Sequence, residues 1–104
     1  MAEVIWTEPA LADLDAIADY IALDKPDAAG RFVKRVFKRV EQLASFPETG
    51  SFISEMRPLK THRQVVVAPC RIFYRFDPKA ATVRIVGVMR GERRFRRESL
   101  DREG

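Results

Sequence analysis

The side chains of this sequence best suited to chemistry are arginines, and they gather in two stretches. Residues 86–97 read VGVMRGERRFRR, an apolar run followed by Arg90, Arg93, Arg94, Arg96 and Arg97. The stretch from residue 56 to residue 76 contains no acid and holds Arg57, Lys60, Arg63, Arg71 and Arg75. Guanidinium groups can hold phosphate through paired N–H bonds, stabilise charged transition states or bind acidic protein surfaces. All three uses are open at this point.

Few residues could move protons beside these arginines. His62 is the only histidine and lies in a basic loop next to Arg63, where cations disfavour its charged form. One histidine cannot form a zinc site alone, and the single cysteine, Cys70, has no histidine near it in sequence. We expect an exposed loop histidine, a packed thiol, no metal and no cofactor. Tyr74, Lys60 and His62 are the candidate proton carriers.

Length and charge limit the class of protein. A chain of 104 residues predicts a single domain over residues 1–104, with residues 96–104 as a polar C-terminal tail. One cysteine excludes an internal disulfide, and the sequence has no long apolar run and no basic leader, so a cytoplasmic setting is expected. Residues 1–30 carry seven acids and one lysine, a net charge of −6; because the total is +4, residues 31–104 carry +10. This asymmetry favours an anionic partner for the basic part.

Two helices are predicted in the first half of the chain. An extended segment over residues 3–7 ends at Thr7, which stands in an N-cap position before Glu-Pro. Apolar residues then recur every three or four positions over residues 11–21 and again over residues 29–44. Pro26 separates the two stripes, because the residue before a proline disfavours helical angles. The short connection predicts an αα-hairpin.

The second half of the chain is β in character. After a loop over residues 45–51, four strands are predicted, at residues 56–59, 64–68, 71–76 and 82–89. In RIFYRF, alternation places Phe73 on the same face as Arg71 and Arg75, so we expect that face to be half covered. The β-α-α-β-β-β-β order predicts an α+β fold, with the N-terminal strand and the αα-hairpin packed on one face of an antiparallel sheet.

With these residues assembled, the chain resembles the RelE/ParE family of toxins from bacterial type II toxin–antitoxin systems. The resemblance is carried by VIWTEPALADLDAIADYIALDKPDAAGRF, the LASFPETG loop, Arg57, CRIFYRF and the VMRGERR end of the last strand. The N-terminal string and the FPETG loop are most similar to the ParE branch. The family fold, a helical hairpin packed on an antiparallel sheet, agrees with the order derived from the sequence pattern.

The resemblance implies one of two activities. RelE-like members cut messenger RNA on the ribosome with basic residues and a late tyrosine or histidine, whereas ParE-like members poison DNA gyrase. At those late positions this sequence has Arg90 and Phe95, and neither side chain exchanges protons at neutral pH. The favoured hypothesis is therefore a ParE-like toxin, of the kind linked to plasmid stabilization, that inhibits gyrase by binding and has no catalytic residue.

Two alternatives stay open. A RelE-like ribosome-dependent endoribonuclease would hold phosphate with Lys60, Arg71 and Arg90 and move protons with Tyr74 or His62. A degenerate, non-toxic module would serve mainly to hold its antitoxin. Strong growth arrest on induction would exclude the second of these.

The resemblance also implies partners. A ParD-like antitoxin is expected in every case, with DNA gyrase as the target, or the ribosome and mRNA if the nuclease alternative holds. We expect no membrane contact and no direct DNA binding outside the antitoxin complex. The antitoxin is predicted to be acidic, because residues 31–104 carry +10. The residues predicted to bind the target or the antitoxin are Arg57, Arg63, Arg71, Arg75, Arg90, Arg93 and Arg94.

Overall fold

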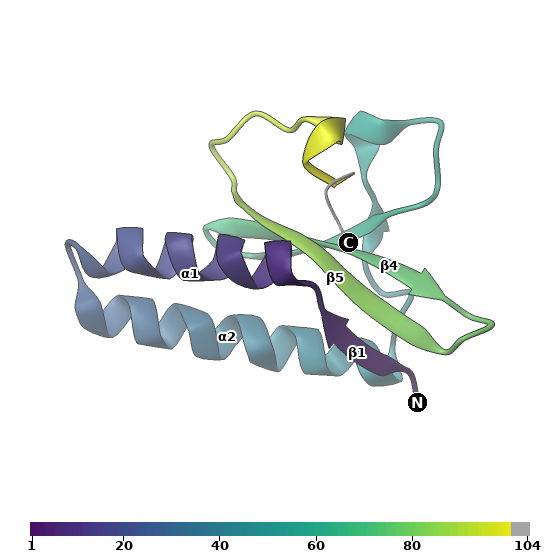
Figure 1. Cartoon of the computed structure of the whole chain (residues 1–104), viewed down its shortest axis with the longest axis horizontal. Coiled ribbons are helices and arrows are strands. Elements are labelled where there is room, and N and C mark those ends of the chain that lie inside the picture. Colours follow the sequence, from purple (N-terminus) through teal and green to yellow (C-terminus); the bar gives the residue numbers. More distant parts are fainter. Residues whose placement is uncertain (101–104) are drawn as a thin grey trace.

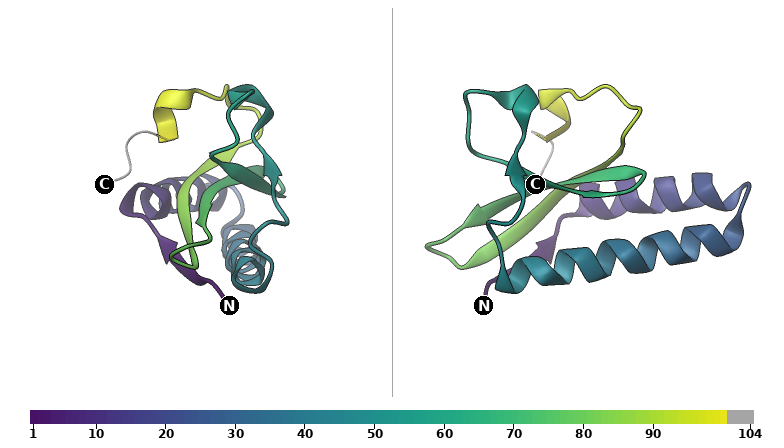
Figure 2. Two further views of the ribbon diagram at one scale, coloured as in Figure 1. Left: turned by 90° about the vertical axis from the view of Figure 1, so that its right-hand side faces the viewer. Right: turned by 180° about the vertical axis from the view of Figure 1, so that it is seen from behind.

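A computed structural model describes residues 1–100, which form a helical hairpin and a five-stranded sheet (Figure 1). The helices α1 (Glu8–Ala22) and α2 (Pro26–Ser45) lie side by side against one face of the sheet. The segments before β3 and after β5 cover part of the opposite face, as the two turned views show (Figure 2). The fold therefore has a helical layer, a central sheet and a small third layer without long helices.

The sheet is antiparallel except at one edge. Its spatial order is β1 (Glu3–Trp6), β5 (Thr82–Arg90), β4 (Cys70–Asp77), β3 (Arg63–Val67) and β2 (Ser51–Phe52). The predicted α+β class and element order are confirmed. The N-terminal strand, however, is itself part of the sheet, and it runs parallel to β5. A parallel neighbour is possible there because a long crossover, which includes the whole hairpin, separates the two strands in sequence.

Thr7 joins the first helix to the sheet. Its Oγ1 accepts a hydrogen bond from the N–H of Ala10 at 3.3 Å, as an N-cap residue does, and donates one to the Ile85 carbonyl at 2.8 Å. The predicted cap is therefore confirmed, and it also fixes where α1 begins relative to β5. No helix within residues 1–100 is long and apolar enough to cross a membrane.

The main core lies between the helices and the sheet. The helices contribute the buried side chains of Ala10, Leu14, Ile17, Phe32, Val36, Val40 and Leu43. The sheet contributes Val65, Val67, Cys70, Ile72, Tyr74, Val83, Ile85 and Val88. The apolar spacing read from the sequence thus identifies the core face of both helices. Leu11, the first residue of the expected stripe, is 42% exposed, and Ala10 is buried in the first turn instead.

A second, smaller core covers the sheet face turned away from the helices. It consists of Ile53, Met56, Phe73, Val86 and Leu100, with Met89 and Phe95 packed against it. Phe73 is 1% exposed, whereas Arg75 on the same face is exposed, so the expectation of a half-covered face is confirmed. The covering side chains come from two segments far apart in sequence, which alternation along one strand cannot indicate.

The end of the described chain belongs to this second core. Arg97–Leu100 forms a 3-10 turn, and Leu100 is 2% exposed, so the polar-tail prediction is wrong for that residue. Arg96 and Arg97 are exposed, as a solvated tail would be. Residues 101–104 of the predicted tail lie outside the described part of the chain.

The strand predicted at residues 56–59 is not formed. A 3-10 helix at Ser54–Met56 lies there instead, and the short edge strand β2 lies earlier, where the predicted loop of residues 45–51 ends. Ile53 and Met56 are both buried in the second core, and residues three apart share a side of a 3-10 turn. Alternating strand geometry would have pointed these two side chains to opposite faces.

Candidate functional site

The basic residues singled out in the sequence do not form one cluster. Arg63 and Arg71 are largely covered and bind their own chain, whereas Arg90 is partly covered beside α1. The side chains exposed to solvent are those of Arg57, Lys60, Arg75, Arg93 and Arg94. The first group stabilises the fold, and in the second group Arg57, Lys60, Arg93 and Arg94 are the side chains we consider for contact with a partner.

Arg63 holds the FPETG loop against the sheet. Its Nη1 donates to the carbonyl oxygens of Glu48 and Gly50, at 3.1 and 2.7 Å, and its Nη2 lies 3.5 Å from a carboxylate oxygen of Glu48. The guanidinium carbon is 4.0 Å from the centre of the Phe52 ring. The Arg63 side chain is only 18% exposed, and these contacts give it a structural role.

Tyr74 binds the same loop through its buried hydroxyl group. Its hydroxyl donates to the Pro47 carbonyl at 2.8 Å and accepts the N–H of Gly50 at 2.9 Å. The residue is fully buried, and that burial raises the pKa of the phenol above its ordinary value. A Cβ atom on residue 50 would lie 2.5 Å from the Tyr74 hydroxyl, which explains the glycine there. The proton of Tyr74 is therefore committed to an internal hydrogen bond.

Arg71 is the centre of the polar contacts over the second core. Its Nη1 donates to both carboxylate oxygens of Glu55, at 3.2 and 2.9 Å, and to Oε1 of Gln64 at 3.2 Å. The guanidinium carbon lies 5.2 Å from the Phe73 ring centre and 5.6 Å from that of Phe95. Arg71 thus links the Ser54–Met56 turn, β4 and the C-terminal segment, and its charge is balanced by Glu55.

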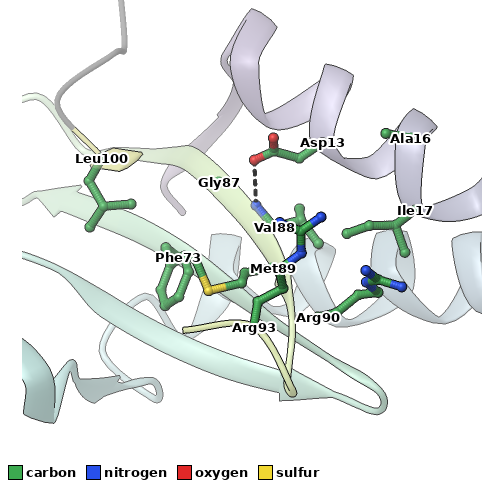
Figure 3. A pocket seen from close by; sticks show the side chains of 10 residues that line it. All are labelled: Asp13, Ala16, Ile17, Phe73, Gly87, Val88, Met89, Arg90, Arg93 and Leu100. Atoms are coloured by element: carbon green, nitrogen blue, oxygen red, sulfur yellow. Dashed lines mark hydrogen bonds between the residues drawn. The ribbon is translucent and has the colours of Figure 1, made fainter. Parts of the chain in front are cut away.

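Arg90 is the first arginine of the arginine-rich segment and lies between the sheet and α1. Its guanidinium carbon is 4.2 Å from the ring centre of Tyr20, and its Nε is 3.2 Å from a carboxylate oxygen of Glu92. Arg90 and the exposed Arg93 both line a pocket of about 240 Å³ (Figure 3). In this pocket the predicted late arginines meet the helical hairpin.

Asp13 forms the polar wall of this pocket. Its Oδ2 accepts the backbone N–H of Val88 at 3.0 Å, as the dashed line in Figure 3 marks. The last residue of β1, Trp6, pairs with Ile85, so β1 does not reach as far as Val88. The carboxylate therefore supplies an acceptor to β5 beyond the end of β1. The sequence analysis counted Asp13 only as charge and assigned it no such role.

Other residues were also missed or misjudged from the sequence. Tyr20 and Glu55 carried no signal, because the arginines that contact them are distant in the chain. His62 is half-buried rather than exposed, and its Nδ1 lies 2.9 Å from Thr61 Oγ1. Within residues 1–100, no group of three or more His, Cys, Asp or Glu side chains could hold a metal ion.

Cys70 is a packed thiol in the main core, as the sequence predicted. Burial, together with the charge of Glu92, raises its pKa to about 11, although Arg90 acts in the opposite direction. A thiol with so high a pKa is protonated at neutral pH and is a poor nucleophile. Cys70 therefore offers no nucleophilic chemistry to this surface.

Comparison with known proteins decides the family. The model of the family described as the ParE toxin of the type II toxin–antitoxin system parDE matches residues 4–95. The chain belongs to this toxin family. Toxin RelE2 of Caulobacter vibrioides is 40% identical over 87 residues, which are 82% of this chain and 93% of that protein. The ParE/RelE superfamily is thus established for nearly all of the described chain.

Solved structures of toxins share the fold. The match to a structure of the chromosomal ParDE toxin–antitoxin system of P. aeruginosa covers 88% of this chain and 98% of the matched chain, with a TM-score of 0.72 and 26% identity. The match to the isolated RelE toxin of E. coli covers 90% of this chain and 88% of the RelE chain, with a TM-score of 0.61 and 13% identity. The second likeness is one of fold alone, whereas the first agrees with the ParE family match.

Proposed function

We propose that this protein is a ParE-like toxin that inhibits DNA gyrase by binding to it and is neutralised by a ParD-like antitoxin. One observation carries the proposal: two of the groups that an RNA-cutting site would use, Tyr74 and Arg71, are engaged within the chain. The Tyr74 proton is bonded to the Pro47 carbonyl, and Arg71 is paired with Glu55. Phe95, at the late position, has no proton to exchange and packs edge-on against Phe73.

The contact surface follows from what is left exposed. Arg57, Arg93 and Arg94 project from the turns around the second core, and Arg90 lies at the neighbouring pocket. Arginine is enriched at the energetic centres of protein interfaces, because its guanidinium combines charge, fixed donors and a flat face. These four residues are the proposed contacts with gyrase or with the antitoxin. Both partners, and therefore the toxin, would act in the cytoplasm.

A supercoiling assay tests the proposal. Purified toxin is expected to inhibit DNA supercoiling by gyrase, and the double variant Arg93→Ala/Arg94→Ala should require roughly tenfold more protein for the same effect. The matched control is Lys34→Ala/Lys38→Ala, which removes the same charge from an exposed face of α2 and should change little. If excess wild-type toxin leaves supercoiling intact beside a known inhibitor, the proposal is wrong.

The antitoxin part has its own test. An acidic antitoxin segment bound to the basic surface gives an affinity that weakens as salt rises, because exposed charges are screened. Titration calorimetry with the antitoxin encoded beside this gene, at 50 and 500 mM salt, measures this. An affinity independent of salt would show that electrostatic attraction does not contribute to antitoxin binding.

The second candidate is a RelE-like ribosome-dependent ribonuclease. The observation that favours it is the relative named RelE2, which is 40% identical to this chain. In that case Lys60, Arg71 and Arg90 would hold phosphate, with His62 or Tyr74 as proton carrier. Primer extension on messages from expressing cells separates the two candidates. New 5′ ends inside translated codons would support the nuclease, and their absence during strong growth arrest would reject it.

A further inference from the structure

The solvent-facing side of α2 carries a row of cations. The opposite, apolar side of α2 packs into the main core, and the helix lies at the outer edge of the molecule in the left view of Figure 2. Positions three and four residues apart share one face of a helix. Five basic residues follow this spacing on the outer side: Arg31, Lys34, Arg35, Lys38 and Arg39. Because each residue of a helix rises by about 1.5 Å, the row is about 12 Å long.

The charge of this row is not neutralised by its own chain. No acid occurs over residues 28–40. Within residues 1–100, none of the five cations forms an ion pair with an acidic side chain. Arg35 donates to the Ala68 carbonyl at 2.8 Å, and Arg39 donates to two side-chain oxygens of uncharged residues at 3.3 and 3.4 Å. These partners are neutral, so all five positive charges remain.

The stability of the helix does not account for this arrangement. Three pairs of like charges stand four residues apart in the row, namely Arg31 with Arg35, Lys34 with Lys38, and Arg35 with Arg39. Like charges at that spacing destabilise a helix. Cations stabilise a helix in its last turn, where α2 has no basic residue. A polyanion along the row would convert the repulsion into charge-assisted contacts.

The composition of the row distinguishes a nucleic acid from an acidic protein. The centre of a protein interface is apolar and depleted of lysine, whereas nucleic acid interfaces are more polar and much more positively charged. Within Pro26–Ser45, the only exposed large apolar side chain is that of Phe37. Its ring packs against Trp6 of β1, with the two ring centres 5.1 Å apart. The row thus lacks the apolar centre that a protein partner would use.

A duplex is the form of nucleic acid that this row fits. Proteins that hold single strands stack the bases on aromatic side chains, and the row contains none. A duplex presents its phosphates on the outside, where cations can contact them without reading bases. An anionic membrane is a poorer match, because a basic helix that binds lipid inserts its apolar side, whereas the apolar side of α2 is buried in the main core.

We propose that the outer face of α2 binds the sugar–phosphate backbone of duplex DNA, with Arg31, Lys34 and Lys38 as the principal contacts. This goes beyond inhibition of gyrase, because it gives the toxin alone an affinity for DNA that is independent of sequence. It departs from the expectation, drawn from the sequence, that direct DNA binding would not occur outside the antitoxin complex. The choice of DNA over double-stranded RNA rests on the proposed function, because gyrase acts on DNA.

The proposed DNA contacts are separate from those proposed for gyrase. Arg93 and Arg94 follow β5 on the side of the second core, whereas α2 covers the opposite face of the sheet. Loss of DNA affinity at α2 should therefore leave the inhibition of gyrase in place. The two activities can be measured on the same variants and can fail independently.

Fluorescence anisotropy with the full chain and a labelled 20-base-pair DNA duplex tests the site. Wild-type protein is expected to bind at 50 mM salt. The triple variant Arg31→Gln/Lys34→Gln/Lys38→Gln should weaken binding by roughly tenfold or more and lower the slope of log K against log salt by about 2 to 3, one for each lost phosphate contact. Lys34→Arg/Lys38→Arg keeps the charge and should bind as wild type does.

The matched control is Lys79→Gln/Arg96→Gln/Arg97→Gln, which removes the same charge from exposed positions outside α2. It should change the affinity less than about threefold. Thermal unfolding is expected to show the α2 variant folded, because its three side chains are exposed and glutamine is a good helix former.

Each other outcome would overturn the proposal. No binding at 50 mM salt, or equal losses in the two triple variants, would show that the row is not a DNA site. Tighter binding to single-stranded DNA or to duplex RNA of the same length would contradict the assigned ligand. Displacement of the probe by a polyglutamate peptide at lower charge concentration than by unlabelled duplex would indicate an acidic protein instead. Supercoiling is scored separately, so a toxin that inhibits gyrase without binding DNA would reject this inference alone.

Discussion

The two faces of the sheet are built in different ways. The helical face is covered by two long regular helices whose apolar stripes were readable from spacing alone. The opposite face is covered by short turns around Ile53, Met56 and Leu100, and polar contacts of Arg71 lie across it. The first face is thick and continuous, whereas the second is thin and assembled from segments far apart in sequence.

This difference separates stability from recognition. The core behind the helices contains more buried side chains than the second core, and burial of apolar area is the main favourable contribution to folding. The thin cover leaves arginines exposed at the rim of an ordered apolar cluster, as protein interfaces require. Changes on the helical face should therefore act chiefly on folding, and changes on the other face chiefly on partners.

The largest expected effect compares two equally buried phenylalanines. Phe32→Ala in the main core should lower the free energy of unfolding by about 4 to 5 kcal/mol, and Phe73→Ala in the second core by about 3, because the thin cover can collapse into the space. Denaturant unfolding measures both. Trypsin should also cut the segment after Gly91 faster in Phe73→Ala. Equal losses, with unchanged proteolysis, would contradict the distinction between the faces.

Two glycines give the next comparison. Gly50→Ala places a methyl group 2.5 Å from the Tyr74 hydroxyl and 2.7 Å from the Gln64 carbonyl oxygen, so it should destabilise by roughly 2 to 3 kcal/mol. Gly30→Ala meets nothing within 4 Å on an exposed part of α2 and should stabilise by roughly 0.4 to 1 kcal/mol. Thermal unfolding of the two variants checks the signs, and destabilisation by Gly30→Ala as large as that by Gly50→Ala would contradict the account.

The pairing of Glu55 with Arg71 predicts a dependence of stability on pH. Burial alone would raise the pKa of Glu55, but hydrogen bonds from the backbone and from Arg71 outweigh it and lower the pKa. The stabilisation of the fold by the ionised Glu55 is therefore fully present above the pKa of about 4.3 in the unfolded chain. It is lost as the pH falls through the lower pKa that Glu55 has in the folded protein. Because Glu55 is partly exposed, the contribution of this pair to the free energy of unfolding should not exceed about 1 kcal/mol.

Unfolding curves between pH 3 and pH 7 test this pairing. Glu55→Gln should unfold more easily than wild type at pH 7, and the difference should shrink as the pH falls. Glu41→Gln, on the exposed side of α2, is the matched control and should show no such convergence. A difference that stays constant down to pH 3 would show that the Glu55 charge contributes nothing.

The last comparison concerns the reactivity of Cys70. With a pKa of about 11 and a side chain in the main core, the folded thiol should react with a disulfide reagent at pH 8 at least about a hundredfold more slowly than the unfolded chain. Absorbance of the released thiol reagent, with and without guanidinium, measures the ratio. Similar rates in the two states would show that the helical face opens readily.

Much of the fold could be predicted because its signals are local. Apolar residues at helical spacing placed both helices, and Thr7 placed the first cap. The strands β3, β4 and β5 were predicted to within a residue or two, since each is a β-branched or aromatic run between turn residues. The family resemblance drew on these same segments, and the family match over residues 4–95 confirmed it.

The rest depends on contacts between distant residues. The parallel pairing of β1 with β5, the Glu55–Arg71 pair and the bond from Tyr74 to the FPETG loop each join residues that no short window connects. The arginines look alike in sequence, yet Arg63 and Arg71 are largely covered and structural, whereas Arg93 and Arg94 are exposed. Only the fold separates these roles.

The central claim is that the toxin acts by binding and not by catalysis. A titration of gyrase supercoiling with purified toxin tests it most directly, with Tyr74→Phe measured beside wild type at a temperature where both are folded. Inhibition that rises with toxin and levels off near one toxin per gyrase binding site, unchanged in Tyr74→Phe apart from stability, is the predicted result. Intact supercoiling at excess toxin, together with messenger RNA cleavage in a translation extract that Tyr74→Phe abolishes, would contradict it.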